Sequence, residues 1–383
     1  MQTNRLLLTA LILLSCIGAH SQIQLTKNRK PTAHIVLADT TLATRQAARL
    51  LNTFISRMGN QELPIVAKEK GKNTVVIGHA SHKAGEDGFE ISCTKGRLTI
   101  LSGGDKGAAL GVAHLLKRFL DCDYLTKQAW KAPRNENIML PAIDHWTETP
   151  AFRYRQSQSY GNQDELYRLW FGFEEPEQIF AGRLWVHTFN RILPSSRYGK
   201  THPEWYSMIN GRRQPGDHSQ WCLTNPELFK EVCRKLDSIF AAHPDLKLIS
   251  VSQNDGNNTN CTCNECKAVD EYEGAVSGNY IHFMNKLATR YPDKEFSTLA
   301  YLFTMNPPKH VKPLPNVNIM LCDIDSRREV PLTDNKSGQE FVKAMEGWSK
   351  LTNNIFVWDY GINFDNVVAP FPNFHILQKN IQL

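Results

Sequence analysis

The sequence predicts an α/β protein, with a small α+β sandwich followed by a (β/α)8 TIM-type barrel that looks incomplete at its C-terminus. Apolar residues recur at helical spacing in two stretches, 41–58 and 106–120. Two short apolar runs flank Lys95-Gly96 and read as a hairpin. After residue 150, strands, polar loops and helices alternate without hairpin turns, and this alternation is typical of a parallel sheet.

The first region, residues 24–145, is expected to form the sandwich. Its expected strands are 33–37, 73–78, 88–92 and 97–102, and its helices are 41–58 and 106–120. Gly103 and Gly104 precede the second helix, but their spacing is wrong for a phosphate-binding loop. We therefore interpret them as a tight turn from strand to helix.

The second region, residues 150–383, is expected to form the barrel. Its expected strands are 152–155, 184–187, 220–223, 246–252, 296–301, 317–322 and 355–358. The expected helices include 280–291, 336–350 and one that is capped by Thr224 or Asn225, with Pro226 in its first turn. Seven such strands suit a barrel better than an open sheet. The chain stops inside the expected seventh helix, so we expect an eighth strand beyond Leu383.

The pattern of the N-terminal segment, residues 1–21, predicts a signal peptide. Arg5 precedes an apolar run of about twelve residues, and Gly18-Ala19 and Ser21 provide a small-x-small cleavage site. A membrane-spanning helix needs about 20 apolar residues, which disfavours a retained anchor. Leu13-Leu14-Ser15-Cys16 also resembles a lipoprotein box, although Leu14 fits it poorly. We expect export to the periplasm or cell surface, with a lipid anchor at Cys16 as the alternative to simple secretion.

Composition and charge exclude some partners. The formal charge of +6 is spread along the chain without a basic cluster, so nucleic acid is not an expected partner. The only expected contact with a membrane is the lipid anchor at Cys16.

Residues at the expected strand ends are the candidates for chemistry, because barrel enzymes carry their sites where strands end and loops begin. Carboxylates are frequent there, at Asp255, at Asp323 and Asp325, and at Asp359. Glycoside cleavage uses an acid together with a base or nucleophile, and we choose Asp255 and Asp359 as catalytic candidates. Aspartates that cap helices or hold loops are the structural alternative. The candidate substrate contacts are His187, Asn190, Asn254, Tyr301, Trp358, Tyr360 and Arg155.

A cysteine cluster is the most specific local pattern. Cys261, Cys263 and Cys266 follow the fourth expected strand, and Cys222 lies in the third. Four thiols that meet there could bind a structural metal, zinc or iron, as thiolates. They could instead form disulfides, which an exported protein permits. We expect no cofactor to be required for the reaction, and a structural zinc ion is possible.

Several motifs together resemble glycoside hydrolase family 163. They are Ser252-Gln253-Asn254-Asp255 followed by C-x-C-x-x-C, the runs 202–206 and 222–227, Leu299-Ala300-Tyr301, and Trp358-Asp359-Tyr360. The first region, with Ser102-Gly103-Gly104 and the run 150–155, is similar to the N-terminal domain of hexosaminidases and α-glucuronidases.

The resemblance implies an endo-β-N-acetylglucosaminidase that cuts complex N-glycans or glycoproteins with net retention. It also implies a further strand and a glutamate-bearing loop past residue 383, and if that glutamate is catalytic the chain as given is inactive. The alternatives are an α-glucuronidase-like hydrolase, with Arg155, Arg327 and Arg328 binding a uronate, and a non-catalytic glycan-binding lipoprotein.

Overall fold

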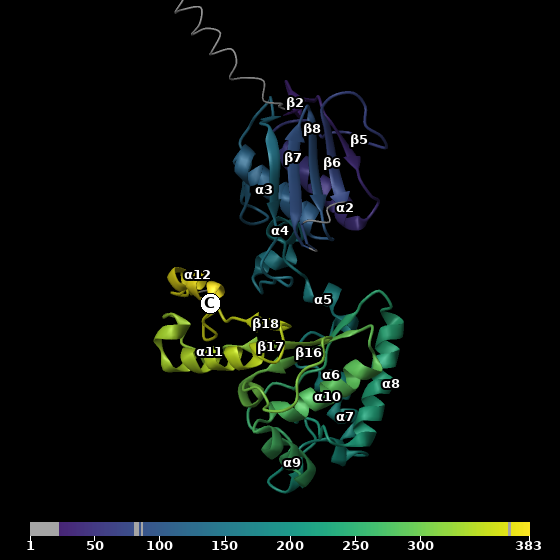
Figure 1. The fold of residues 1–383 in the computed structure, drawn as a ribbon, viewed down its shortest axis with the longest axis vertical. Coiled ribbons are helices and arrows are strands. Elements are labelled where there is room, and N and C mark those ends of the chain that lie inside the picture. Colours follow the sequence, from purple (N-terminus) through teal and green to yellow (C-terminus); the bar gives the residue numbers. More distant parts are fainter. Residues whose placement is uncertain (1–22, 80–83, 86, 367–368) are drawn as a thin grey trace, which may run out of the picture. The chain divides into compact units, whose positions relative to one another are not determined.

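The structure, a computed structural model, describes residues 23–79, 84, 85, 87–366 and 369–383. The expected signal peptide and Cys16 lie outside these residues. The chain divides into two compact units, Met1–Glu175 and Pro176–Leu383 (Figure 1). Within the described ranges, no helix has the length and apolar character needed to cross a membrane.

The first unit contains a six-stranded sheet in the order β12-β7-β8-β6-β4-β5. Strands β4, β5, β6 and β8 are parallel, whereas β7 runs antiparallel to β8 and β12 antiparallel to β7. The strand bounds are β4 His34–Leu37, β5 Ile65–Val66, β6 Thr74–His79, β7 Phe89–Thr94, β8 Arg97–Ser102 and β12 Ile143–Glu148. The predicted hairpin at Lys95-Gly96 is therefore confirmed.

Three two-stranded pairings complete the strands of the first unit. They join β1 Ile23–Gln24 to β11 Met139–Leu140, β2 Thr26–Lys27 to β3 Lys30–Pro31, and β9 Asp123–Tyr124 to β10 Trp130–Lys131.

Two amphipathic helices, α2 (Leu42–Arg57) and α3 (Gly107–Leu120), pack on each other and on this sheet, as the helical spacing predicts. The short helix α4 (Glu165–Phe171) also packs against them. Its Trp170 is buried in their core and stacks on Phe54 at a centroid distance of 4.8 Å. Residues 150–175, which the sequence analysis assigns to the second region, therefore belong to the first unit.

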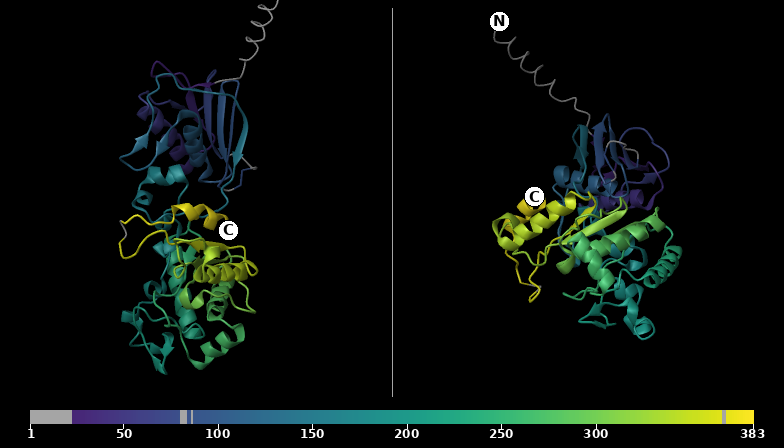
Figure 2. Two further views of the ribbon diagram at one scale, coloured as in Figure 1. Left: turned by 90° about the vertical axis from the view of Figure 1, so that its left-hand side faces the viewer. Right: turned by 60° about the horizontal axis from the view of Figure 1, so that its bottom comes forward.

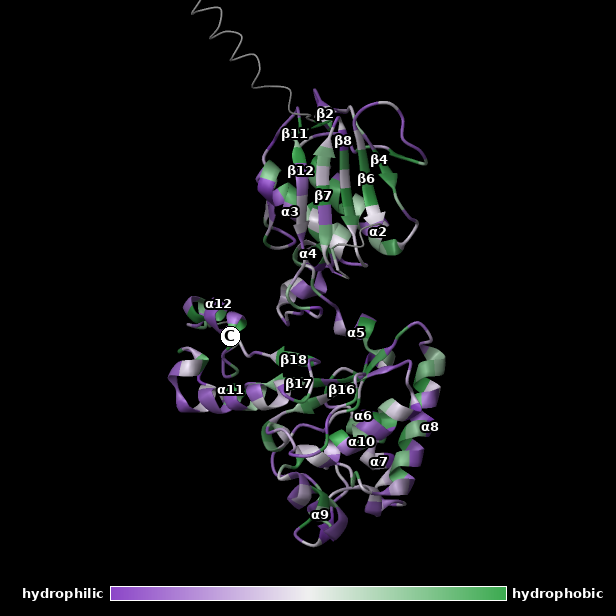
Figure 3. Cartoon of the chain, in the orientation of Figure 1, coloured by the Kyte–Doolittle hydropathy of each residue, from purple (hydrophilic) through white to green (hydrophobic). Residues whose placement is uncertain are grey.

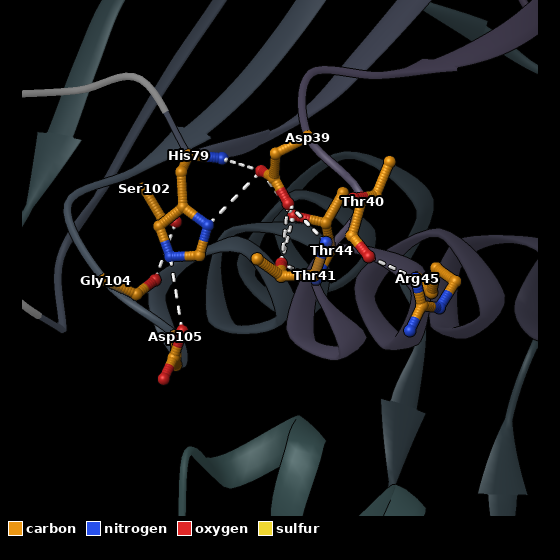
Figure 4. Close-up of polar contacts among 9 residues, drawn as sticks. All are labelled: Asp39, Thr40, Thr41, Thr44, Arg45, His79, Ser102, Gly104 and Asp105. Atoms are coloured by element: carbon orange, nitrogen blue, oxygen red, sulfur yellow. Dashed lines mark hydrogen bonds and ion pairs between the residues drawn. The ribbon is translucent and has the colours of Figure 1, made fainter. Parts of the chain in front are cut away.

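Figure 4 shows a polar cluster where β4, β6 and β8 end. Asp39 accepts hydrogen bonds from the backbone N–H of His79 and Thr41 and from the hydroxyls of Thr41 and Thr44. Burial alone would raise the pKa of Asp39, but these hydrogen bonds outweigh it and hold the pKa well below its usual range. The hydroxyl of Thr41 caps α2. These contacts give Asp39 a structural role.

The second unit is built on a four-stranded parallel sheet in the order β15-β16-β17-β18. The bounds are β15 Leu248–Ser250, β16 Glu295–Ala300, β17 Val317–Cys322 and β18 Ile355–Trp358. A single parallel bridge joins Phe180 to Leu248 of β15. The sheet order follows the chain order, as it does in a barrel, but the described strands form an open sheet and a closed barrel is not confirmed.

Helices cover one face of this sheet. The α-helices found among the described residues of the unit are α5 Pro176–Ile179, α6 Phe189–Ile192, α7 Ser195–Tyr198, α8 Pro226–Ala242, α9 Asn264–Glu273, α10 Ser277–Arg290, α11 Lys336–Ser349 and α12 Phe374–Gln382. Figure 2 shows the unit from two further sides, and Figure 3 shows polar and apolar residues interleaved along α8. Asn225 caps α8, with Pro226 at its first position, as the sequence predicts.

The two faces of the sheet carry different clusters, because side chains alternate along a strand. Ile249, Phe296 and Ile319 pack in one core with residues of α8, α10 and α11. Leu299 and Met320 point to the opposite face. There they join a second cluster that is rich in aromatic residues, with Trp185, Phe356, Trp358 and Tyr360.

Three strands that the sequence predicts within residues 150–383 are wrong. Residues 152–155 and 184–187 form no strand, and within 220–223 only Trp221 makes a bridge, to Tyr206. Alternating apolar residues suggest strands at these places, but the backbone turns instead. His187 has φ +51°, a left-handed conformation that interrupts an extended run.

Candidate active site

The carboxyl ends of β15 to β18 bring most of the predicted site residues together. Asp255, Tyr301, Asp323 and Asp359 follow the four strands in that order. In a parallel sheet these ends lie on one edge, where the side chains of neighbouring loops can meet. Neighbouring strands are about 4.8 Å apart, so β15 and β17, which flank β16, are separated by roughly 10 Å.

Asp255 is held by Tyr301, and His187 packs beside this pair. The Tyr301 hydroxyl donates to Asp255 Oδ1 at 3.0 Å. Burial, followed by this hydrogen bond, raises the pKa of Tyr301 well above its usual value, so the phenol keeps its proton. The His187 ring meets the Tyr301 ring edge-on at 5.7 Å, and its Nδ1 lies 2.9 Å from the carbonyl oxygen of Gln253. The strained backbone of His187 fits a functional position.

Asp323 and Asp359 form a carboxylate pair at the ends of β17 and β18. Asp323 is only 4% exposed, whereas Asp359 is exposed. Burial, and then the adjacent carboxylate of Asp359, raise the pKa of Asp323 to about 7. Asp323 Oδ1 also accepts from the Tyr360 N–H at 3.3 Å. Asp323 therefore keeps its proton up to about neutral pH, and Asp359 is the exposed member of the pair.

Aromatic rings line up beside this pair. Trp185 and Trp358 stack at 4.9 Å with an interplanar angle of 12°, and Tyr360 continues the row at 5.8 Å from Trp358. All three rings are partly exposed. Flat aromatic faces suit the apolar faces of sugar rings. The guanidinium of Arg328 lies over the Tyr360 ring at 5.1 Å and holds it in place.

Other predicted substrate contacts already have internal partners. Asn254 is buried, donates to the Ser219 carbonyl at 2.7 Å and accepts from the Asn190 N–H at 2.9 Å. The Asn190 side chain accepts from the Ser195 N–H and donates to Asp217. These contacts shape the loop of Asp255.

Arg155 lies in the first unit. Its guanidinium bonds to the carbonyl oxygens of Phe152 and Gly172 and pairs with Asp87 at 3.3 Å.

The predicted cysteine cluster does assemble. The Sγ atoms of Cys222, Cys261, Cys263 and Cys266 all lie within 4.8 Å of one another, and each residue is buried. All four are free thiols. Predicted disulfides are therefore not formed in the structure.

Two residues of this site, Asp323 and Trp185, are not among those predicted from the sequence. Asp323 stood among the strand-end carboxylates but was not chosen. A signal was available, because Asp323 follows the apolar run of residues 319–322 in β17, which predicts burial. Trp185 gave no comparable signal, since its stacking partner Trp358 is distant in sequence.

The sequence profile of a domain of unknown function, DUF4838, matches residues 124–383. The chain belongs to the DUF4838 family. The match covers the whole second unit, with both carboxylate groups and the cysteine cluster. No curated protein matches the chain. The finer resemblance to glycoside hydrolase family 163 stays a prediction.

Several solved structures are similar to the chain, and they are glycoside hydrolases. The N-acetyl-β-hexosaminidase of Streptomyces plicatus is 10% identical, with a TM-score of 0.49, 95% of this chain covered and 78% of that chain. The β-N-acetylhexosaminidase of Bacteroides fragilis is 11% identical, with a TM-score of 0.48 and coverages of 91% and 76%. A family GH115 4-O-methyl-α-glucuronidase with specificity for decorated arabinogalactans is 9% identical, with a TM-score of 0.46 and coverages of 88% and 54%.

Proposed function

We propose that this DUF4838 protein is a glycoside hydrolase of GlcNAc-containing glycans, specifically a retaining endo-β-N-acetylglucosaminidase that acts on complex N-glycans. The motifs that resemble glycoside hydrolase family 163 support this choice of substrate. The site residues support the class of reaction, because glycoside cleavage needs two carboxyl groups with different tasks.

The observation that carries the proposal is the proton that Asp323 holds next to Asp359, at the same end of the sheet as Asp255. A general acid must be protonated at the working pH, and burial and the like charge of Asp359 give Asp323 a pKa of about 7. The proton rests on Asp323, and the exposed carboxylate of Asp359 accepts it and passes it on to the glycosidic oxygen. Asp359 therefore contacts the substrate, and Asp323 supplies the proton from behind it.

Asp255 assists the attack on the anomeric carbon. Its carboxylate, held by Tyr301, orients the 2-acetamido group, whose oxygen attacks the anomeric carbon. The glycosidic C–O bond breaks as the pair transfers its proton to the leaving oxygen. Water then opens the ring formed with the acetamido group and returns a proton to the pair, which gives net retention. The row of Trp185, Trp358 and Tyr360 supports the sugar from the side.

The α-glucuronidase alternative is less well supported. It requires arginines that are free to bind a uronate carboxylate. Arg155 pairs with Asp87, and Arg327 pairs with Glu329. Arg328 bonds to the Ile324 carbonyl and covers Tyr360.

The test is incubation of the protein with a glycoprotein that carries complex N-glycans, followed by mass spectrometry of both products. We expect released glycans with one GlcNAc at the reducing end, and one GlcNAc left on the asparagine. Asp255→Asn should abolish release, while Asp245→Asn, at an exposed turn before β15, serves as the matched control. Release of uronic acid, or glycan binding without any cleavage, would overturn the proposal in favour of one of the two alternatives.

We also propose that the protein acts after export, at the cell surface or in the periplasm, as residues 1–21 predict. N-terminal analysis of protein from its host distinguishes a chain that starts at Gln22 from one lipidated at Cys16. A chain that retains Met1 would refute export by cleavage.

A further inference from the structure

The cysteine cluster lies outside the proposed active site and has the dimensions of a metal centre. Cys222 Sγ is 3.7 Å from Cys263 Sγ and 3.9 Å from Cys266 Sγ. A zinc ion with four sulfur ligands at about 2.3 Å requires tetrahedron edges of about 3.8 Å. Cys222 Sγ lies at similar distances from two other sulfurs, which indicates one centre shared by several thiols. A disulfide would instead require two sulfurs about 2.05 Å apart.

The surroundings of the cluster suit thiolates. The Met208 N–H donates to Cys261 Sγ at 3.3 Å, and Arg213 Nη1 donates to the same sulfur at 3.4 Å. The Thr224 hydroxyl lies 3.3 Å from Cys266 Sγ. Zinc with four thiolates carries a net charge of −2, which the Arg213 guanidinium partly offsets. Such outer contacts orient ligands and stabilise their charge.

The local fold presents these ligands without rearrangement. Met208 and Arg213 belong to a short hairpin, β13 (Met208–Ile209) with β14 (Arg212–Arg213). Cys263 caps helix α9 and Cys266 lies in its first turn, where the helix dipole favours negative charge. All four cysteines are at most 5% exposed, so the centre is closed to solvent and substrate, as a structural site requires.

We propose that Cys222, Cys261, Cys263 and Cys266 bind one structural zinc ion. Zinc binding releases the protons of the thiols that are still protonated. The ion joins two segments that are distant in sequence, namely Cys222, directly after Trp221, and residues 261–266 at the start of α9. The β13–β14 hairpin is attached to this centre by its hydrogen bonds to the Cys261 sulfur.

This centre also fixes the loop that carries Asp255, an inference that rests on the proposed function. Gln220, two residues before Cys222, donates to the Asn254 carbonyl and the Thr259 hydroxyl, both at 2.9 Å, and accepts from the Asn254 N–H at 2.8 Å. The loop from Asn254 to Cys261 is thus held at one end by Gln220 and at the other by the metal.

The experiment measures metal in the purified full chain by mass spectrometry, together with zinc release when a mercurial reagent titrates the thiols. We expect one zinc per chain, released in step with modification of four thiols. Cys266→Ser should lose this zinc. Cys233→Ser, which alters a buried cysteine of α8 outside the cluster, should keep it. If Cys266→Ser fails to fold, the thiol titration of the unaltered protein still tests the zinc site.

Three results would overturn the zinc site: protein without stoichiometric metal, iron in place of zinc, or disulfides among these four residues detected after alkylation. The two proposals fail separately. A zinc protein that leaves glycans intact contradicts only the proposed function, and a glycosidase without metal contradicts only the zinc site.

Discussion

Replacement of Asp323 by asparagine tests the carboxylate pair most directly. The amide keeps the shape of the side chain but removes a buried group whose ionisation is unfavourable. The pKa of Asp323 is raised from 3.8 to about 7. At about 1.36 kcal/mol per pH unit, this shift means that ionising Asp323 costs about 4 kcal/mol more in the folded state than in the unfolded state.

The direction of the pH dependence of stability follows from the raised pKa of Asp323. An acid with a raised pKa in the folded state contributes stability below its unfolded pKa and loses it as pH rises through the folded value. The wild-type protein therefore loses this stability between about pH 4 and pH 7. Asp323→Asn does not, so its advantage should grow to about 4 kcal/mol at about pH 8 and vanish near pH 4.

Two assays on the same variant check this reasoning. Urea unfolding at several pH values gives the free energy of unfolding, and glycan release gives kcat/KM. We expect a more stable protein with kcat/KM reduced by about 10²–10⁴-fold, the usual contribution of general acid catalysis. A variant that is less stable at alkaline pH, or equally stabilised at every pH, would refute the proposed proton of the pair.

Four further outcomes are expected. Asp359→Asn removes the like charge beside Asp323 and should lower the pKa of Asp323. In urea unfolding at several pH values, the fall in the free energy of unfolding should then end at a lower pH than in the wild type. Tyr301→Phe removes a hydrogen bond to a carboxylate, worth about 1.5–3 kcal/mol, and should lower kcat/KM about tenfold or more; unchanged kinetics would contradict the role of Asp255. Trp358→Ala should raise KM more than it lowers kcat, measured with a series of glycan lengths. Asp39→Asn should lower the melting temperature of the first unit at neutral pH. The difference from the wild type should shrink in acid, because the low pKa of Asp39 supplies stability that is lost as pH falls. An equal loss at all pH values would indicate that Asp39 acts through packing alone.

The sequence predicts the elements whose signals are local. The helical spacing of 41–58, the turn at Lys95-Gly96 and the apolar run of β17 each specify one element, and each is observed. Residues 152–155 and 184–187 alternate like strands, yet the backbone there is irregular. The isolated pattern contains no information on whether a neighbouring strand is present to pair with.

The same limit applies to the site. Asp255 and Asp359 were recognisable as strand-end carboxylates, and the four cysteines as a cluster. The pKa of Asp323 could not be predicted, because it depends on the proximity of β17 and β18. Asn190 and Asn254 look like free polar groups in the sequence, but they bond to each other in the structure.

The bonds of Gln220 to Asn254 also bear on the order in which the chain folds. These residues are 34 positions apart, and α8 and β15 lie between them. A buried amide with no partner is costly, so these bonds can form only when the helix and strand have already docked. The bonds that hold the loop of Asp255 should therefore be lost together with this docking, so activity and the sheet should disappear over the same range of denaturant.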